Sequence, residues 1–302
     1  MKTKNFLTRL IATVLLRSIL MMLILPCASF QSESYIAPIR SETDAALQAL
    51  ASTPTNMRKA YLSGNCKRLE GTPYVVVFYL DDDVSSWTEE EVQIYNEQLI
   101  SPALDFLDDN AAQWGVDLCM KVGAYASYSH PSRAVAYDGV IENFNDGNIS
   151  QDILDQAAVA AGFTSKEHMH ECLTEHAGTD QIAYVIMVDK GGRSYSCPRQ
   201  GKNRNVSDEY ELEYSVIFSG FTDTSRDSAS DTVAHELLHL FGAEDYYYPE
   251  SRKALAEKFY PTDIMLCGMS DLAYFTLDAF TAYTLGWTDT VPEVCHMPGW
   301  WG

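Results

Sequence analysis

Four segments rich in Val, Ile, Leu, Tyr and Phe are distributed along the chain at lengths typical of strands. The first, "YVVVFYL", contains no charged residue, which predicts a strand buried on both faces of a sheet. The predicted strands lie at 74–80, 116–129, 181–189 and 214–221.

Helical spacing of apolar residues follows the first strand. The apolar positions continue as far as Trp114, with Ser86 or Thr88 as the N-cap. Pro102 lies inside this pattern, and proline removes a hydrogen bond from a helix interior, so we expect a kink there. A strand followed by a helix and further strands predicts an α+β fold whose N-terminal lobe resembles an α/β protein.

The order of elements divides the chain into segments. Residues 30–72 are polar and predict an N-terminal extension or a prosegment. Residues 73–302 form the predicted functional domain, with an N-terminal lobe at about 73–242 and a smaller lobe at about 243–302. Residues at about 130–180 predict an insertion with two short helices, and a longer helix should begin near Ser228.

Residues 1–29 predict a secretory signal peptide. Basic residues precede an apolar run, and small residues near its end suit cleavage after Ser29. Arg17 shortens the uninterrupted apolar run below the length that spans a bilayer. An uncleaved anchor is the alternative, and lipidation at Cys27 is disfavoured by Pro26. We therefore expect the protein outside the cytoplasm, secreted or at the cell surface, with no membrane segment after cleavage.

The net charge excludes one class of partner. Removing the four basic residues of the predicted signal changes the formal charge from −21 to −25. Such a surface repels phosphate backbones and anionic lipids, so nucleic acid is not an expected partner.

Cysteine usage agrees with export. Six cysteines remain after the signal, with no CxxC pair among them, so up to three disulfides are expected in an oxidising compartment. Six cysteines allow fifteen pairings, and the sequence does not choose among them. They are Cys66, Cys119, Cys172, Cys197, Cys267 and Cys295.

The stretch "HELLH" at 235–239 concentrates candidate chemistry. On a helix, His235 and His239 project from one face a turn apart, which is half of a zinc site. Glu236 lies beside the first ligand, where its carboxylate can act as a general base on a metal-bound water. Gly242 can adopt the left-handed conformation that ends a helix, and Asp245 can then become the third ligand.

The whole pattern, HExxHxxGxxD, resembles the extended motif of the metzincin zinc endopeptidases, with aspartate in place of their usual third histidine. Metzincins also place a methionine-containing turn beneath the metal. The segment "YPTDIMLCGMS" resembles that turn, with Met265 the better match and Met269 the second. The resemblance implies a zincin fold with a mixed sheet, an active-site helix and an irregular, helical C-terminal lobe.

Other residues are weaker candidates. Tyr246 begins a run of three tyrosines after the third ligand and is a candidate for the cleft or the oxyanion, with a packed aromatic cluster as the alternative. The resemblance suggests Tyr274 as a transition-state donor. The aspartates at 81–83 are a calcium candidate that nothing else supports, and a solvated turn is favoured.

The expected function is a secreted zinc endopeptidase, active as a monomer on protein or peptide substrates that lie extended along an edge strand. Within peptidases, the alternative is another zincin clan whose third ligand comes later, such as Glu257 or Asp271. From another class, the alternative is a non-catalytic zinc-binding surface protein.

Overall fold

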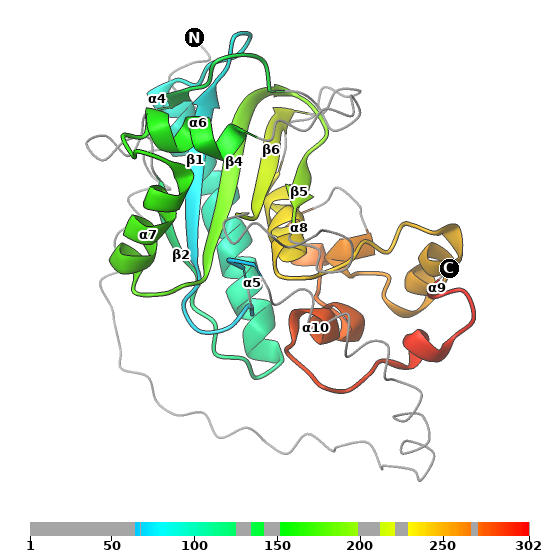
Figure 1. The fold of residues 1–302 in the computed structure, drawn as a ribbon. Helices are drawn as coiled ribbons and strands as arrows, with labels where there is room; N and C mark the ends of the chain where they lie inside the picture. Colours follow the sequence, from blue (N-terminus) through cyan, green and yellow to red (C-terminus); the bar gives the residue numbers. More distant parts are fainter. Residues whose placement is uncertain are drawn as a thin grey trace, which may run out of the picture. The chain divides into compact units, whose positions relative to one another are not determined.

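A mixed six-stranded sheet forms the centre of the computed structural model (Figure 1). The strand order is β2-β1-β4-β6-β5, and the short β3 pairs with the far end of β1. All neighbours are parallel except β5, which runs antiparallel to β6 at one edge. The strands are β1 (Tyr74–Asp81), β2 (Lys121–Ala124), β3 (Val135–Ala136), β4 (Ile182–Gly191), β5 (Tyr195–Cys197) and β6 (Tyr214–Gly220).

The described residues belong to one unit of the chain, Ala45–Gly302. They are 64–66, 68–124, 134–141, 152–198, 212–220, 229–266 and 271–301. The predicted signal peptide, the suggested helix start at Ser228, Cys267 and Met269 therefore lie outside the described residues.

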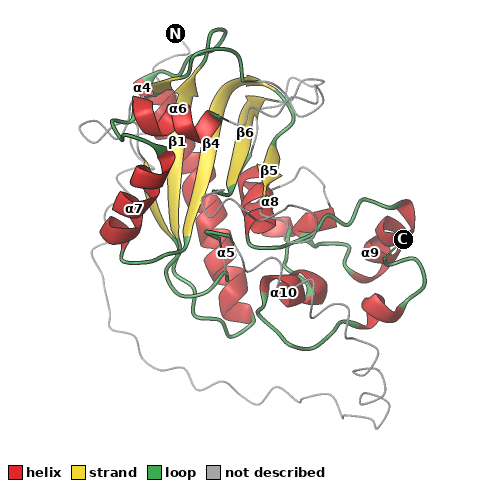
Figure 2. Ribbon diagram, viewed as in Figure 1, coloured by secondary structure: helices red, strands yellow, loops and turns green. Residues whose placement is uncertain are grey.

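Strand β1 is buried on both faces, as its sequence predicts. Successive side chains of a strand point to opposite faces, and here each face joins a separate core. Val75, Val77 and Tyr79 pack in one core, whereas Phe78 and Leu80 pack in the other. The sheet is therefore the middle layer between two sets of helices (Figure 2).

The helix predicted after β1 is interrupted where the sequence places its kink. It consists of α4 (Glu89–Tyr95), a π-helical turn (Asn96–Ile100) and α5 (Ser101–Gln113), with Pro102 in the first turn of α5. Thr88 is the N-cap, because its side chain accepts from the Glu91 backbone N–H while the Glu91 side chain bonds back.

Helices α6 (Ile153–Ala160) and α7 (Lys166–Ala177) cover the other face of the sheet (Figure 1). Their apolar residues, including Leu154 and Leu173, pack in the same core as Phe78 and Leu80. The segment predicted as an insertion thus supplies one of the three layers.

Helix α8 (Ser230–Leu240) packs against α5, β5 and β6 and carries the HExxH stretch. It begins after Ala229, which makes no side-chain capping bond. The residues that follow form α9 (Glu250–Phe259), α10 (Ala279–Leu285) and short 3-10 helices at Ile264–Leu266, Leu272–Tyr274 and Glu293–His296. A mixed sheet with helices and a helical C-terminal region makes this an α+β fold.

Residues at the end of the predicted N-terminal extension are built into this fold. Cys66 and Leu69 are fully buried in the core beneath α5 and α8. The Leu69 carbonyl accepts from Trp287 Nε1 at 2.7 Å. Removal of the chain up to residue 72 would therefore take buried side chains out of the core.

Among the described cysteines, Cys66, Cys119, Cys172 and Cys295 are free thiols in the structure. The disulfides stay a prediction. Across the residues that the structure describes, the helices are too short or too polar to cross a bilayer.

Asp263 anchors the C-terminal region and gives a test of the fold. Its buried carboxylate accepts from the Met265 N–H at 2.8 Å, the Asp278 N–H at 2.7 Å and the Thr281 hydroxyl at 2.9 Å. Asp263→Ala would leave these donors without an acceptor, so we expect the free energy of unfolding to fall by about 2–3 kcal/mol.

The control is Asp271→Ala, which removes an exposed carboxylate that caps the Ala273 N–H. Urea unfolding of the metal-free proteins should give a loss below about 1 kcal/mol for this control. Equal losses in the two variants would contradict the role of Asp263.

Candidate metal centre

Helix α8 turns both histidines of the motif toward one point. Residues four apart lie one turn above another on the same face. His235 Nε2 and His239 Nε2 are 3.2 Å apart, and the two rings meet edge to face at 89°. Their side chains are 13% and 17% exposed, so ligands can reach them from one side only.

The helix ends in the way that the glycine predicts. Gly242 has a φ of 103°, a left-handed conformation that glycine adopts at little cost. The Gly242 N–H bonds to the His239 carbonyl and the Ala243 N–H to the Leu238 carbonyl, which is the hydrogen-bond pattern of a Schellman motif. The chain then turns back beneath the histidines.

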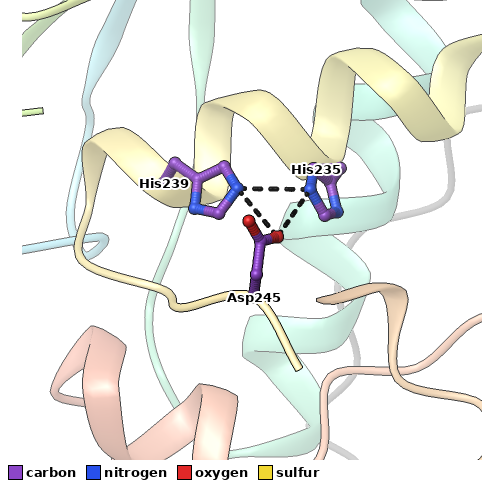
Figure 3. A group of neighbouring side chains, drawn as sticks. All are labelled: His235, His239 and Asp245. Carbon is purple, nitrogen blue, oxygen red and sulfur yellow. Dashed lines mark hydrogen bonds and ion pairs between the residues drawn. The ribbon is translucent and has the colours of Figure 1, made fainter. Parts of the chain in front are cut away.

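The turn brings Asp245 to the histidine pair (Figure 3). Asp245 Oδ1 lies 3.2 Å from Nε2 of His235 and 3.2 Å from Nε2 of His239. Three donor atoms from one helix and the following turn therefore form a nearly equilateral triangle.

Backbone carbonyls orient both rings. His235 Nδ1 lies 3.1 Å from the Ile264 carbonyl, and His239 Nδ1 lies 2.9 Å from the Ala243 carbonyl. A carbonyl only accepts, so each Nδ1 carries a proton and, in the neutral ring, each Nε2 presents a lone pair. Ligating histidines are usually held in this way.

The carboxylate of the triangle needs a balancing positive charge. Asp245 Oδ1 is buried and has no hydrogen-bond donor with suitable geometry. Burial alone would raise the pKa of Asp245, but the two histidines hold it well below its usual range. Burial alone would lower the pKa of His239, but Asp245 and Glu236 raise it to about 9. A proton or a metal ion must therefore balance the carboxylate.

These three residues could hold a metal ion. Tetrahedral zinc with bonds of about 2.0–2.1 Å has about 3.3 Å between its ligand atoms. The three distances of 3.2 Å match one face of such a tetrahedron. Two imidazoles and a carboxylate are also the donor chemistry of zinc sites that leave a fourth position open.

Glu236 follows His235 in α8, is 7% exposed, and its charge contributes to the raised pKa of His239. Its Oε2 lies 2.7 Å from the hydroxyl of Ser196 on β5. Ser196 could not be singled out from the sequence, because β5 is only three residues long and lies within a polar stretch.

Arg252 of α9 holds the turn that carries Asp245. Its Nη1 lies 2.9 Å from Glu244 Oε2 and 3.1 Å from the Asp245 carbonyl, and its Nε donates to the Trp300 carbonyl at 2.9 Å. Glu244 therefore pairs with arginine, while its neighbour Asp245 faces the histidines. The sequence contains no motif that would single out Arg252.

The methionine segment lies against the same turn. Met265 is fully buried, and its carbonyl accepts from the Tyr246 N–H at 2.9 Å. The preceding residue, Ile264, supplies the carbonyl that orients His235. The segment thus contacts both His235 and Tyr246, the residue that follows Asp245.

The tyrosine candidates lie in different surroundings. Tyr246 is fully buried, with its hydroxyl bonded to Thr281 and its ring among Phe280 and Trp300, so it occupies the packed aromatic cluster rather than the cleft. Tyr274 is 71% exposed in its short 3-10 helix. Tyr247, the second tyrosine of the run, is half-buried, and burial and the nearby Asp245 carboxylate raise its pKa.

The alternative third ligands are engaged elsewhere. Glu257 pairs with Lys253 along α9 at 3.9 Å, and Asp271 caps the Ala273 N–H. Asp82, the central residue of the calcium candidate, accepts from the Val84, Ser85 and Ile141 backbone N–H groups and pairs with Lys190. The structure thus gives Asp82 the role of a turn anchor.

Comparison with models of protein families gave no match to this chain, and comparison with curated proteins gave none either. The site is therefore interpreted from its own geometry.

Adjacent carboxylates give a sharp test of the donor set. Asp245→Asn removes the only charge among the three donors, so we expect zinc affinity to fall by about 100-fold or more. Glu244→Gln changes a carboxylate that faces Arg252 and should leave zinc stoichiometry near that of the unchanged protein. Competition with a chromophoric chelator measures zinc affinity and stoichiometry in both variants. Equal losses of zinc affinity in the two variants would exclude Asp245 as a specific ligand.

Zinc binding should also release a proton. With a pKa of about 9, His239 in the metal-free protein is protonated at neutral pH, and a ligating imidazole must be neutral. The apparent affinity should therefore rise about tenfold per pH unit up to about pH 9. Calorimetry at pH 7 in buffers of different ionisation enthalpy should detect about one proton per zinc. Heats that do not depend on the buffer would contradict this assignment.

Proposed function

We propose that this protein is a secreted zinc-dependent endopeptidase of the metzincin-like kind. The observation that carries the proposal is the 3.2 Å triangle of His235, His239 and Asp245 with Glu236 on the adjacent position of the same helix. Secretion is supported by the signal-like residues 1–29.

His235, His239 and Asp245 would hold the zinc. When bound there, zinc supplies Lewis acidity for the scissile carbonyl and makes water more acidic. Asp245 adds a negative charge to the donor set, whereas a third histidine would add none.

Glu236 is the proposed general base. Its carboxylate is buried beside the histidines, so it can take a proton from the attacking water and pass it to the leaving amine. A metal site that serves only structure needs no carboxylate at this position. The location of Glu236 therefore favours hydrolysis over the non-catalytic alternative.

Strand β5 is the proposed docking edge for the substrate. Among the described residues it is the last strand on its side of the sheet, and it runs antiparallel to β6 with Ser196 paired opposite Ser215. A peptide that adds to this edge in extended form would gain main-chain hydrogen bonds while it passes Glu236.

Glu236→Gln tests the mechanism. The change keeps the size of the side chain and removes its basicity, so kcat on a protein substrate such as casein should fall by about 10²–10⁴-fold. Zinc content, measured by elemental analysis, should stay at one ion per chain because Glu236 is not a ligand.

As a control, both the unchanged protein and Glu236→Gln are treated with a chelator and then supplied with zinc again. The activity that each protein has should be lost with the chelator and should return with zinc. Full activity in Glu236→Gln with zinc retained would contradict the mechanism. Zinc binding without cleavage of any peptide by the unchanged protein would favour the surface-protein alternative.

A further inference from the structure

The hydroxyl of Ser196 contacts Glu236, the proposed general base. The Ser196 hydroxyl lies 2.7 Å from Glu236 Oε2, 2.7 Å from the Glu236 carbonyl and 2.8 Å from the Ser215 hydroxyl. Ser215 in turn lies 3.1 Å from the Glu236 carbonyl. Two neighbouring strands thus bring two hydroxyls to one residue of α8.

The Ser196 hydroxyl has a single proton to donate. A carboxylate is the strongest acceptor within reach, because a hydrogen bond to an ionised group is about twice as strong as a neutral one. Ser215 can donate to Ser196 or to the Glu236 carbonyl. The arrangement therefore directs the Ser196 proton toward Oε2 and leaves the other carboxylate oxygen, Oε1, for another partner.

The contact restricts an otherwise adaptable side chain. A glutamate has three side-chain torsions, and its last one is broad, so the carboxylate can rotate unless a partner holds it. Ser196 is itself held by the backbone pairing of β5 with β6 and by its contact with Ser215. The hydroxyl thus anchors one carboxylate oxygen to the sheet.

We infer that Ser196 is a positioning residue for the general base: its hydroxyl holds Oε2 of Glu236 so that Oε1 faces the attacking water. The inference rests on the proposed function and deepens it. Because Ser196 belongs to the strand along which the peptide is proposed to lie, the edge that receives the substrate also orients the base.

Ser196→Ala removes the hydroxyl and should lower kcat about 10- to 100-fold, the usual effect of losing an outer hydrogen-bond partner at such sites. KM should change by less than about threefold, because the backbone of β5 that would pair with the peptide is unchanged. Ser196→Thr restores a hydroxyl and should recover most of the lost kcat. Zinc affinity should change little in both variants, since Ser196 contacts none of the three donors in the described interactions.

Ser219→Ala is the matched control. Ser219 of β6 also donates to a carboxylate, that of Asp189, at 2.9 Å, in another part of the same sheet. Its loss should leave kcat within about twofold. A comparable loss of kcat in both alanine variants, or no recovery in Ser196→Thr, would overturn the inference and indicate a structural role.

A readout other than activity separates this inference from the proposed function. Crystal structures of the metal-free protein and of Ser196→Ala should show one Glu236 carboxylate position in the first and a displaced or split carboxylate in the second. An unchanged carboxylate would overturn the inference. Absence of hydrolysis in the unchanged protein would refute the proposed function and leave this structural comparison to decide the positioning.

Discussion

The negative charge of Asp245, held 3.2 Å from two imidazole nitrogens, is the feature on which the rest of the site depends. The carboxylate oxygen is buried, and the two imidazole nitrogens can each hold either a proton or a lone pair toward it. In a poorly solvated environment this arrangement is costly unless positive charge enters it. A proton on His239 or a bound cation can supply the positive charge that this carboxylate needs.

Contacts within the folded chain establish that geometry. Helix α8 is fixed against the sheet and α5, so the two histidines share one face. The glycine turn ends the helix, and carbonyls of Ala243 and Ile264 fix the rings. Each constraint comes from backbone hydrogen bonds or core packing, which are rigid compared with long surface side chains. A site preorganised in this way loses little conformational entropy when it binds its ligand.

The sequence predicted the features that depend on short-range pattern. Strand β1, the π-helical turn just before Pro102 and the helix end at Gly242 lie where local apolar spacing, proline and glycine place a strand, a helix irregularity and a helix end. The convergence of Asp245 with the histidines also follows, because all three residues lie within eleven positions. These features need only the geometry of one helix and one turn.

The features that the sequence did not predict depend on distant parts of the chain. Strand β5 has three residues and is stabilised by pairing with β6 rather than by its own composition. Ser196 meets Glu236 across forty positions, a proximity that no spacing rule describes. Likewise, the apolar spacing in α6 and α7 predicts two helices. Which face of the sheet these helices cover depends on the folded arrangement and does not follow from that spacing. The zincin-like character of the fold is part of the proposed function.

The contact of Arg252 with Trp300 has a consequence for the order of events during biosynthesis. Arg252 hydrogen-bonds Glu244 and the Asp245 carbonyl, and it also donates to a carbonyl that lies 48 positions later in the chain. A nascent polypeptide that has reached only α9 therefore lacks one of the contacts that hold this arginine in place. The turn that carries Asp245 gains its full support only after residue 300 has left the ribosome and folded back, so the donors of the candidate metal centre are not fully held in place before that point.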